Sequence, residues 1–424
     1  MFNNLINKVE FTAKNLTAHA GLVPLLNFTN ISGILEMFSN ILQFDKNSTE
    51  KIKMKHILAL ICGGIIGIDK LDRFEQMRLD PLYKAIGLDI CTPENISRFL
   101  KQFGFKQTQM IRQISFHLCK MLIKMAKLTE ITIDIDSRCV NSEGNQEGAV
   151  KGYNPERKGN NCYNIQMAFC DELKCFVSGY MRSGNTNTSN GAAELVKEII
   201  QNLKDTVNVI TFRMDCGYFS QEIIEMIENA GHKFIIKVKL YPNILDRLHE
   251  NASDFVDIDE KTTGAVSRTK LDKWSKERMF VMIRQLKPLE YRQQLTFDDR
   301  DNYEYFIFVS NLNLNFEEHY ETYKRRGNAE NYIKETKYDM NIGSVKTQSF
   351  WANEAFFQIM MIVYNIFLLF KMTFMGKNQY REQIKTFRLK YIFVPAKIVR
   401  SGRQTTLQLP HDYYYKEIYK TAVA

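Results

Sequence analysis

The spacing of apolar residues along this chain changes near residue 128. Before that point the apolar runs have helical length, as at 56–68 and 110–125. Thr92 followed by Pro93 predicts a helix start, because Thr caps a helix well and Pro fits the first helical position. The inward side chains of that helix would be Ile96, Phe99 and Leu100. The pattern therefore predicts an all-helical N-terminal domain over residues 1–128.

From residue 129 the pattern becomes one of short alternating strands and amphipathic helices. In chain order, the predicted elements are strands at 131–137, 163–169 and 175–181, a helix capped by Asn190, a strand at 207–214, a helix from Ser220, and a strand at 234–240. Strands two and three form a hairpin. Three strands, helix, strand, helix, strand is the order of a ribonuclease-H-like core, an α/β fold in which helices cover a mixed sheet. We assign residues 129–240 and 303–345 to this core.

Residues 241–302 interrupt the core with a segment that it does not need. A strand at 278–284, and another at 302–311 where the core resumes, predict a β-rich insertion. We expect residues 346–424 to form a C-terminal helix and a β-hairpin tail, which turns near Gly402.

The longest apolar run, residues 356–370, contains Gln358 and Asn365. It is shorter than the roughly 20 residues that a membrane span requires. We therefore predict a buried helix here and no membrane partner.

Composition adds modest limits. The formal charge of +9, from 57 basic and 48 acidic residues, is consistent with a phosphate-rich partner without requiring one. The eight cysteines form no CxxC pair and show no zinc-ligand spacing. The N-terminal residues lack the features of a signal peptide. Reduced, mostly structural thiols in a cytosolic protein are the simplest interpretation.

Four polar residues near the end of the core stand at spacings of three, four and seven: Tyr323, Arg326, Glu330 and Lys337. On one continuous helix they would lie within about 60° of one another. Glu330 could then hold a metal ion while the cations hold phosphates. A solvated charged face is the ordinary alternative.

Further acids stand on predicted strands. Asp215 follows the strand at 207–214, and the C-terminal ends of strands are where α/β folds place their chemistry, although Asp215 could simply cap the turn. Asp134 and Asp136 lie two apart in one strand, so both point to the same face, roughly 7 Å apart. These acids are far apart in sequence and can meet only through the fold.

The spacing Tyr-x2-Arg-x3-Glu-x6-Lys resembles the signature of bacterial insertion-sequence transposases of the Asp-Asp-Glu (DDE) class. Similarity to that family continues, in the order it requires, at 131–137, 147–166, 182–194 and 213–220. The resemblance implies that Asp136, Asp215 and Glu330 are the catalytic residues and metal ligands. It favours Asp136, which precedes Ser137, over Asp134, which stays a second choice.

The resemblance also implies the reaction. Oxygen ligands suit Mg²⁺ or Mn²⁺, and two such ions would support cleavage of the element's ends and joining of the 3′-hydroxyl to target DNA. Arg326 and Lys337 would hold phosphates, and Tyr323 would contact a phosphate or a base. Lys151, Arg157 and Lys158, in the loop 151–163, would contact the DNA backbone unless that loop is an ordinary surface turn.

We expect double-stranded DNA as the partner, both terminal inverted repeats and target, and a homodimer that pairs two ends in the bacterial cytoplasm, associated with the nucleoid. In such relatives the N-terminal domain recognises the ends. In this chain, the helix predicted from Pro93 would carry Asn95, Ser97, Arg98, Lys101 and Gln102 on its exposed face, where they could contact solvent or DNA. Two alternatives remain open: a metal-dependent nuclease that only hydrolyses DNA, and a non-catalytic DNA-binding descendant.

Overall fold

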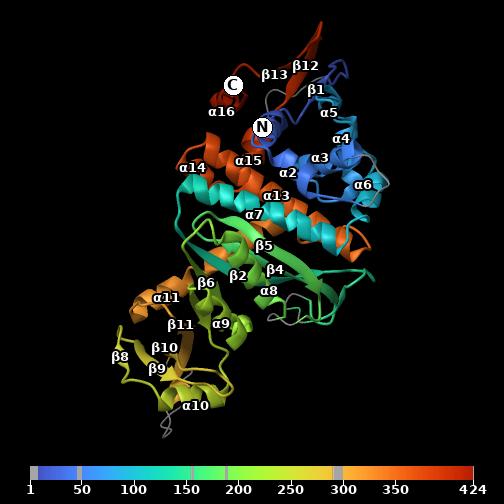
Figure 1. Cartoon of the computed structure of the whole chain (residues 1–424). Coiled ribbons are helices and arrows are strands. Elements are labelled where there is room, and N and C mark those ends of the chain that lie inside the picture. The colour runs from blue at the N-terminus through green and yellow to red at the C-terminus, as the bar shows by residue number, and fades with distance from the viewer. Residues whose placement is uncertain are drawn as a thin grey trace. The chain divides into compact units, whose positions relative to one another are not determined.

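The chain forms two compact units in the computed structural model, which describes residues 8–44, 50–152, 154, 157–186, 190–288, 290 and 299–423. The terminal unit comprises Met1–Ile111, Tyr338–Ile342 and Trp351–Ala424, and the sheet unit comprises Arg112–Lys337 and Gly343–Phe350. Most of the predicted N-terminal domain and the C-terminal region therefore belong to one unit (Figure 1).

Helices dominate the N-terminal part of the terminal unit, as predicted. They are α1 (Leu22–Ile31), α2 (Ile34–Ile41), α3 (Glu50–Ile66), α4 (Phe74–Leu79), α5 (Pro81–Ala85), α6 (Pro93–Leu100) and the first residues of α7 (Phe105–Ala126). The predicted start of α6 is confirmed, because the Thr92 hydroxyl accepts the Asn95 N–H at 3.4 Å. Its predicted inward residues are buried.

The C-terminal part supplies α13 (Phe350–Phe374), α14 (Lys377–Tyr380), α15 (Ile384–Phe387), β12 (Ala396–Ser401), β13 (Gln404–Gln408) and α16 (Lys416–Val423). In the described part of the chain, α13 alone is long and apolar enough to cross a membrane, and 94% of its apolar window is buried inside the protein. The prediction of a buried helix is confirmed. The predicted hairpin is also present: β12 pairs with β13, and the short β1 (Leu16–Thr17) pairs with β12.

The sheet unit is built on a ten-stranded mixed sheet in the order β3-β4-β2-β6-β7-β11-β10-β9-β8, with β5 paired to β4. Its first strands are β2 (Glu130–Asn141), β3 (Val150–Lys151), β4 (Asn161–Cys170), β5 (Cys175–Ser183), β6 (Val209–Met214) and β7 (Lys233–Lys237). Strands β2, β6 and β7 run parallel, whereas β4 is antiparallel to both β2 and β5. This arrangement confirms the predicted order of strands, with β3 as a short addition.

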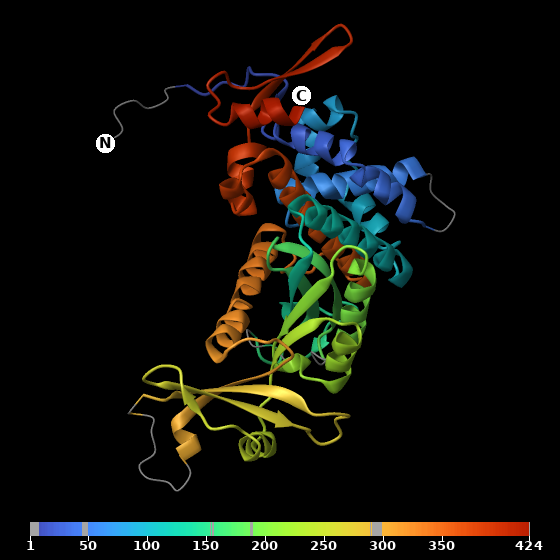
Figure 2. The same ribbon diagram turned by 60° about the vertical axis from the view of Figure 1, so that its left-hand side comes forward.

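Helices cover both faces of this sheet. Figure 2 shows α8 (Ala192–Leu203) and α12 (Gly327–Asp339) on opposite faces, and α9 (Gln221–Asn229) packs beside α8. The predicted cap of α8 by Asn190 is wrong. Gly191 occupies the cap position with a φ of 75°, a conformation that suits glycine, and the Asn190 carbonyl accepts a hydrogen bond from Arg182 at 2.6 Å.

The predicted insertion is rich in strands, and these strands extend the main sheet. After α10 (Pro242–Glu250) come β8 (Val256–Asp257), β9 (Thr262–Thr269) and β10 (Arg278–Leu286), and the predicted core resumes with β11 (Tyr303–Ser310). Strand β11 pairs with β7, with Val309 opposite Ile236. An edge strand left open after β7 would expose unpaired backbone groups, and β11 satisfies them.

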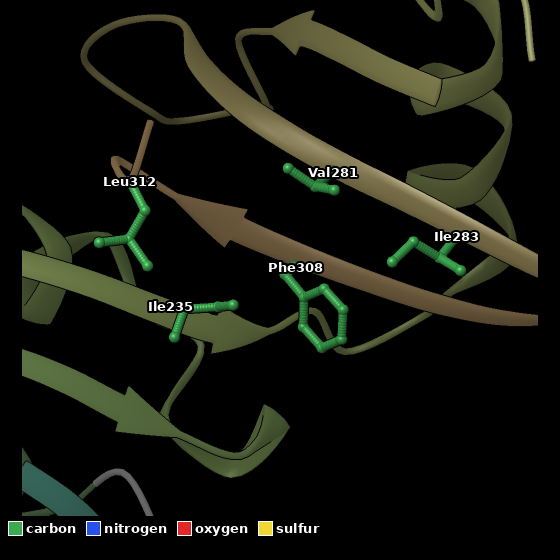
Figure 3. Packing of buried hydrophobic residues seen from close by; sticks show 5 residues of the cluster. All are labelled: Ile235, Val281, Ile283, Phe308 and Leu312. Atoms are coloured by element: carbon green, nitrogen blue, oxygen red, sulfur yellow. The ribbon is translucent and has the colours of Figure 1, made fainter. Parts of the chain in front are cut away.

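One buried cluster joins the inserted strands to the rest of the sheet unit. Figure 3 shows its five side chains, on β7, β10, β11 and the residues after β11: Ile235, Val281, Ile283, Phe308 and Leu312. Three partly buried aromatic residues of α11 (Phe316–Lys324) pack against it: Phe316, Tyr320 and Tyr323. The insertion therefore supports the first of the four signature residues.

Candidate active site

The signature residues do not lie on one helix. The helix predicted to carry all four is divided into α11 and α12 by a turn at Arg325 and Arg326, so that prediction is wrong. In a continuous α-helix the Arg326 N–H would donate to the carbonyl of Thr322. It donates to the Tyr323 carbonyl at 2.9 Å instead, and the Thr322 carbonyl accepts a hydrogen bond from the Arg213 guanidinium at 3.0 Å. The buried arginine of β6 thus occupies the acceptor that an unbroken helix would use.

The turn brings Arg326 to Asp136 on β2. Arg326 Nη1 donates to Asp136 Oδ2 at 3.0 Å, and the other carboxylate oxygen accepts the Ser137 N–H at 2.8 Å. Burial raises the pKa of the Asp136 carboxyl, Arg326 partly offsets this, and the Asp215 carboxylate raises the pKa further. Asp136 therefore lies within electrostatic reach of a second carboxylate, with one arginine as the shared counter-charge.

Asp215 stands directly after β6, where the sequence predicted it. Its carboxylate accepts the Gly217 N–H at 2.8 Å and caps the short helical turn Cys216–Tyr218. The capping role weighed as an alternative is thus present. The charge of Asp215 still acts on the site, because it raises the pKa of Asp136 and helps to raise that of Arg326.

Glu330 lies in the first turn of α12, one helical turn beyond Arg326, and its side chain is exposed. Among the described residues, no three histidine, cysteine, aspartate or glutamate side chains lie close enough together to hold a metal ion. The structure therefore groups Asp136, Asp215 and Arg326, and it leaves Glu330 outside this group. A helix N-terminus is a favourable place for a carboxylate.

The other two signature residues have packing roles as well. The Tyr323 ring lies 4.6 Å from that of Phe308, and the Arg326 guanidinium lies 5.7 Å from the Tyr323 ring. Burial raises the pKa of Tyr323 to about 12, so its hydroxyl remains a neutral donor. Lys337 is half-buried and lies so close to Gly343 that a Cβ there would stand 2.6 Å from its side chain.

Asp134 is engaged elsewhere. Its carboxylate is fully buried and accepts two hydrogen bonds from Arg213, both at 2.7 Å. Arg213 also pairs with Asp171 at 2.8 Å. Sequence reasoning did not single out Arg213 or Asp171. The sequence did contain one signal, because Arg213 is a charged residue on a strand that pairs on both sides. A charged side chain buried in such a strand needs an acidic partner.

The residues predicted to contact the DNA backbone are exposed. Lys151 ends β3, and Arg157 forms an exposed ion pair with Glu143 at 3.3 Å, while Lys158 follows it on the surface. Residues 153, 155 and 156 of this loop, and residues 187–189 of the family-like stretch 182–194, lie outside the described part of the chain.

In the terminal unit, the exposed face of α6 borders a hollow of about 360 Å³. Asn95 and Arg98 of α6 and Gln102 just after it line the hollow, together with Lys53 and Lys55 of α3. Arg98 donates to the Asn95 side chain at 2.9 Å. This hollow therefore combines cationic and amide side chains with one carboxylate, that of Asp89.

The donor set of the site fits a hard divalent cation. Asp136 and Asp215 offer only oxygen ligands, and ions such as Mg²⁺ are commonly held by one or two carboxylates together with substrate phosphates. Burial raises the pKa of Asp136, and the nearby Asp215 carboxylate raises it further. A bound metal ion would add positive charge beside the Asp136 and Asp215 carboxylates.

Comparison with known proteins places these observations in context. Residues 3–424 match the family model described as Transposase DDE domain group 1. No curated protein matches the sequence. Among solved structures, a piggyBac transposase synaptic complex with hairpin DNA is similar over 88% of this chain and 79% of that one, at 12% identity and a TM-score of 0.44. A Mos1 transposase paired-end complex with the left transposon end is similar over 39% of this chain and 57% of that one, at 10% identity and a TM-score of 0.18.

Proposed function

The chain belongs to the Transposase DDE domain group 1 family, and we propose that this transposase cleaves the ends of its element and joins the 3′-hydroxyl to target DNA with the site around Asp136 and Asp215. The observation that carries this proposal is the pairing of Asp136 with Arg326 beside Asp215, since these residues come from three segments far apart in the sequence. The strand order and the parallel β2–β6 pair support a ribonuclease-H-like core.

DDE transposases use divalent metal ions, and Mg²⁺ or Mn²⁺, in a pair, is our proposal for this chain. Asp136 and Asp215 would hold the metal, with Glu330 as the third ligand. The bound metal would polarise the scissile phosphate and increase the acidity of the attacking water or hydroxyl. Asp136 lies in β2 directly after the residues that pair in parallel with β6, and Asp215 directly follows β6, so the sheet holds the two aspartates near each other.

Arg326 has two successive roles in this proposal. Without DNA it neutralises Asp136, because its guanidinium lies 3.0 Å from that carboxylate. With DNA it holds a phosphate next to the scissile one, since a guanidinium can bind two phosphate oxygens at once. Lys337 and the neutral hydroxyl of Tyr323 are the further groups on α11 and α12 suited to phosphate oxygens.

Double-stranded DNA is the proposed partner, as terminal inverted repeats and as target. Lys151, Arg157 and Lys158 would contact its backbone from the sheet unit. Pairing two ends requires at least a homodimer, and the proposed location is the bacterial cytoplasm.

The hollow beside α6 provides a quantitative prediction for DNA binding by the terminal unit. Each lost phosphate contact lowers the slope of log Kobs against log salt by about 0.9 on duplex DNA. We expect the double variant Lys55→Gln, Arg98→Gln to lower that slope by about 1.8, measured by fluorescence anisotropy with a labelled duplex. Lys84→Gln, on the exposed surface of α5, is the control and should leave the slope unchanged. An unaltered slope in the double variant would exclude DNA from this hollow.

Cleavage of a labelled duplex that carries the element's terminal repeat tests the function itself. We expect nicking at the repeat and joining to a target plasmid with Mg²⁺ or Mn²⁺, and neither with EDTA. Nicking without joining would indicate a nuclease that only hydrolyses DNA. Binding without nicking would indicate a non-catalytic DNA-binding protein.

A further inference from the structure

A buried ion-pair network behind the proposed active site connects β2, β6 and the turn between α11 and α12. Its centre is Arg213, whose side chain is 2% exposed, and its innermost member is Asp134, which is 0% exposed. Burying such charges is costly unless every one of them is paired. The pairs are present: Arg213 binds Asp134 through two hydrogen bonds and Asp171 through a third contact at 2.8 Å.

This network also reaches α12. The Tyr332 hydroxyl donates to Asp171 at 3.3 Å, and the Asn328 amide lies 3.5 Å from the same carboxylate oxygen. Arg213 itself contacts the carbonyl of Thr322 in the last turn of α11. One arginine therefore links the buried part of the sheet to both helices that carry the signature residues.

The geometry assigns Arg213 a specific role: we propose that it is a positioning residue that divides the helix at Arg325 and Arg326 and so directs Arg326 to Asp136. Arg213 occupies the Thr322 carbonyl, and the Arg326 N–H turns to Tyr323 instead. The buried Asp134 carboxylate holds the Arg213 guanidinium in place through two hydrogen bonds. Arg213 does not touch the substrate in this proposal, which rests on the proposed function, and it acts only through Arg326.

Arg213→Lys is the variant that tests this role. It keeps the charge but cannot hold Asp134, Asp171 and the Thr322 carbonyl together, because lysine lacks the planar guanidinium. We expect the rate constant of strand joining at saturating DNA to fall about 10- to 100-fold, the range that small misplacements of a catalytic group produce, with DNA affinity unchanged.

Arg278→Lys is the matched control. Arg278 is equally buried, with its side chain 3% exposed, and it lies between Glu225 and Glu228 on the same unit. Its replacement should lower stability similarly and leave the joining rate of the folded protein unchanged. A joining rate for Arg213→Lys equal to that of Arg278→Lys would overturn the proposal.

A double-mutant cycle separates positioning from general structural damage. If Arg213 acts through Arg326, the variant Arg213→Lys, Arg326→Gln should join ends no more slowly than Arg326→Gln alone. Independent effects would multiply, and that result would contradict the proposal. Should Arg213→Lys fail to fold, Asp171→Asn tests the same connection, because the Asp171 side chain is 17% exposed and tolerates replacement better.

Hydrogen exchange supplies a readout that does not depend on activity. Peptides spanning residues 322–330 should exchange faster in Arg213→Lys than in the wild type or in Arg278→Lys, because the turn loses its anchor. Equal exchange in all three proteins would overturn the positioning role even if the chain joined no DNA. Faster exchange in a chain without joining activity would instead refute the proposed function alone.

Discussion

Asp136→Asn and Asp215→Asn should each lower the rate of strand joining by about 1,000-fold or more at saturating DNA and Mg²⁺. A metal ion at a transferring phosphate contributes several kcal/mol of transition-state stabilisation, and each 1.36 kcal/mol corresponds to about tenfold in rate. Replacing either carboxylate by an amide removes a charged ligand with almost no change in shape. The rate of joining of a labelled, pre-cut end to a plasmid measures the effect.

DNA affinity and stability distinguish this result from unfolding. Both variants remove a negative charge near the path of the phosphates, so the affinity for duplex should stay equal or increase. Asp205→Asn, on the exposed surface after α8, is the control and should join ends at the wild-type rate. Wild-type joining by Asp136→Asn would show that the carboxylate bound to Arg326 is not a catalytic ligand.

Phe308→Ala should lower the free energy of unfolding by about 3–5 kcal/mol, the usual cost of removing a buried phenyl ring. Phe308 is fully buried in the cluster that joins β7, β10 and β11 (Figure 3). Its ring lies 4.6 Å from that of Tyr323. The cavity would therefore weaken both the inserted strands and the support of α11. Urea unfolding followed by circular dichroism measures the loss.

Phe308→Leu is the matched variant, since it keeps most of the apolar volume and should lose clearly less stability than the alanine variant. A loss below 1 kcal/mol for Phe308→Ala would mean that the inserted strands are not part of the main core.

The strands and their order were predictable because alternation and turn residues are local signals. The starts of β2, β4 and β5, the helix α6 and the C-terminal hairpin all follow from short stretches of sequence. The extension of the sheet by the inserted strands could not be predicted from the sequence, because it depends on the pairing of β11 with the open edge of β7. The two strands are distant in the chain, and no local pattern records their pairing.

The place of Asp215 after a strand could be predicted from the sequence, whereas the geometry around it could not. The resemblance supplied the signature, and the position of Asp215 followed from the end of β6. Helical spacing predicted one continuous helix, whereas the chain turns at Arg325 and Arg326, next to the Thr322 carbonyl that Arg213 contacts from 109 residues away in sequence. The same buried arginine explains why Asp134 and Asp136, two residues apart, have different surroundings.

In the proposed function, Glu330 completes the site formed by Asp136 and Asp215, although its side chain is exposed and lies outside their group in the structure. The most direct measurement is joining of a labelled, pre-cut end to a plasmid by Glu330→Gln, with Glu317→Gln on α11 as the control. We expect Glu330→Gln to bind DNA normally and to lose joining with both Mg²⁺ and Mn²⁺, while Glu317→Gln joins ends as the wild type does. Joining by Glu330→Gln at the wild-type rate would contradict the three-carboxylate site.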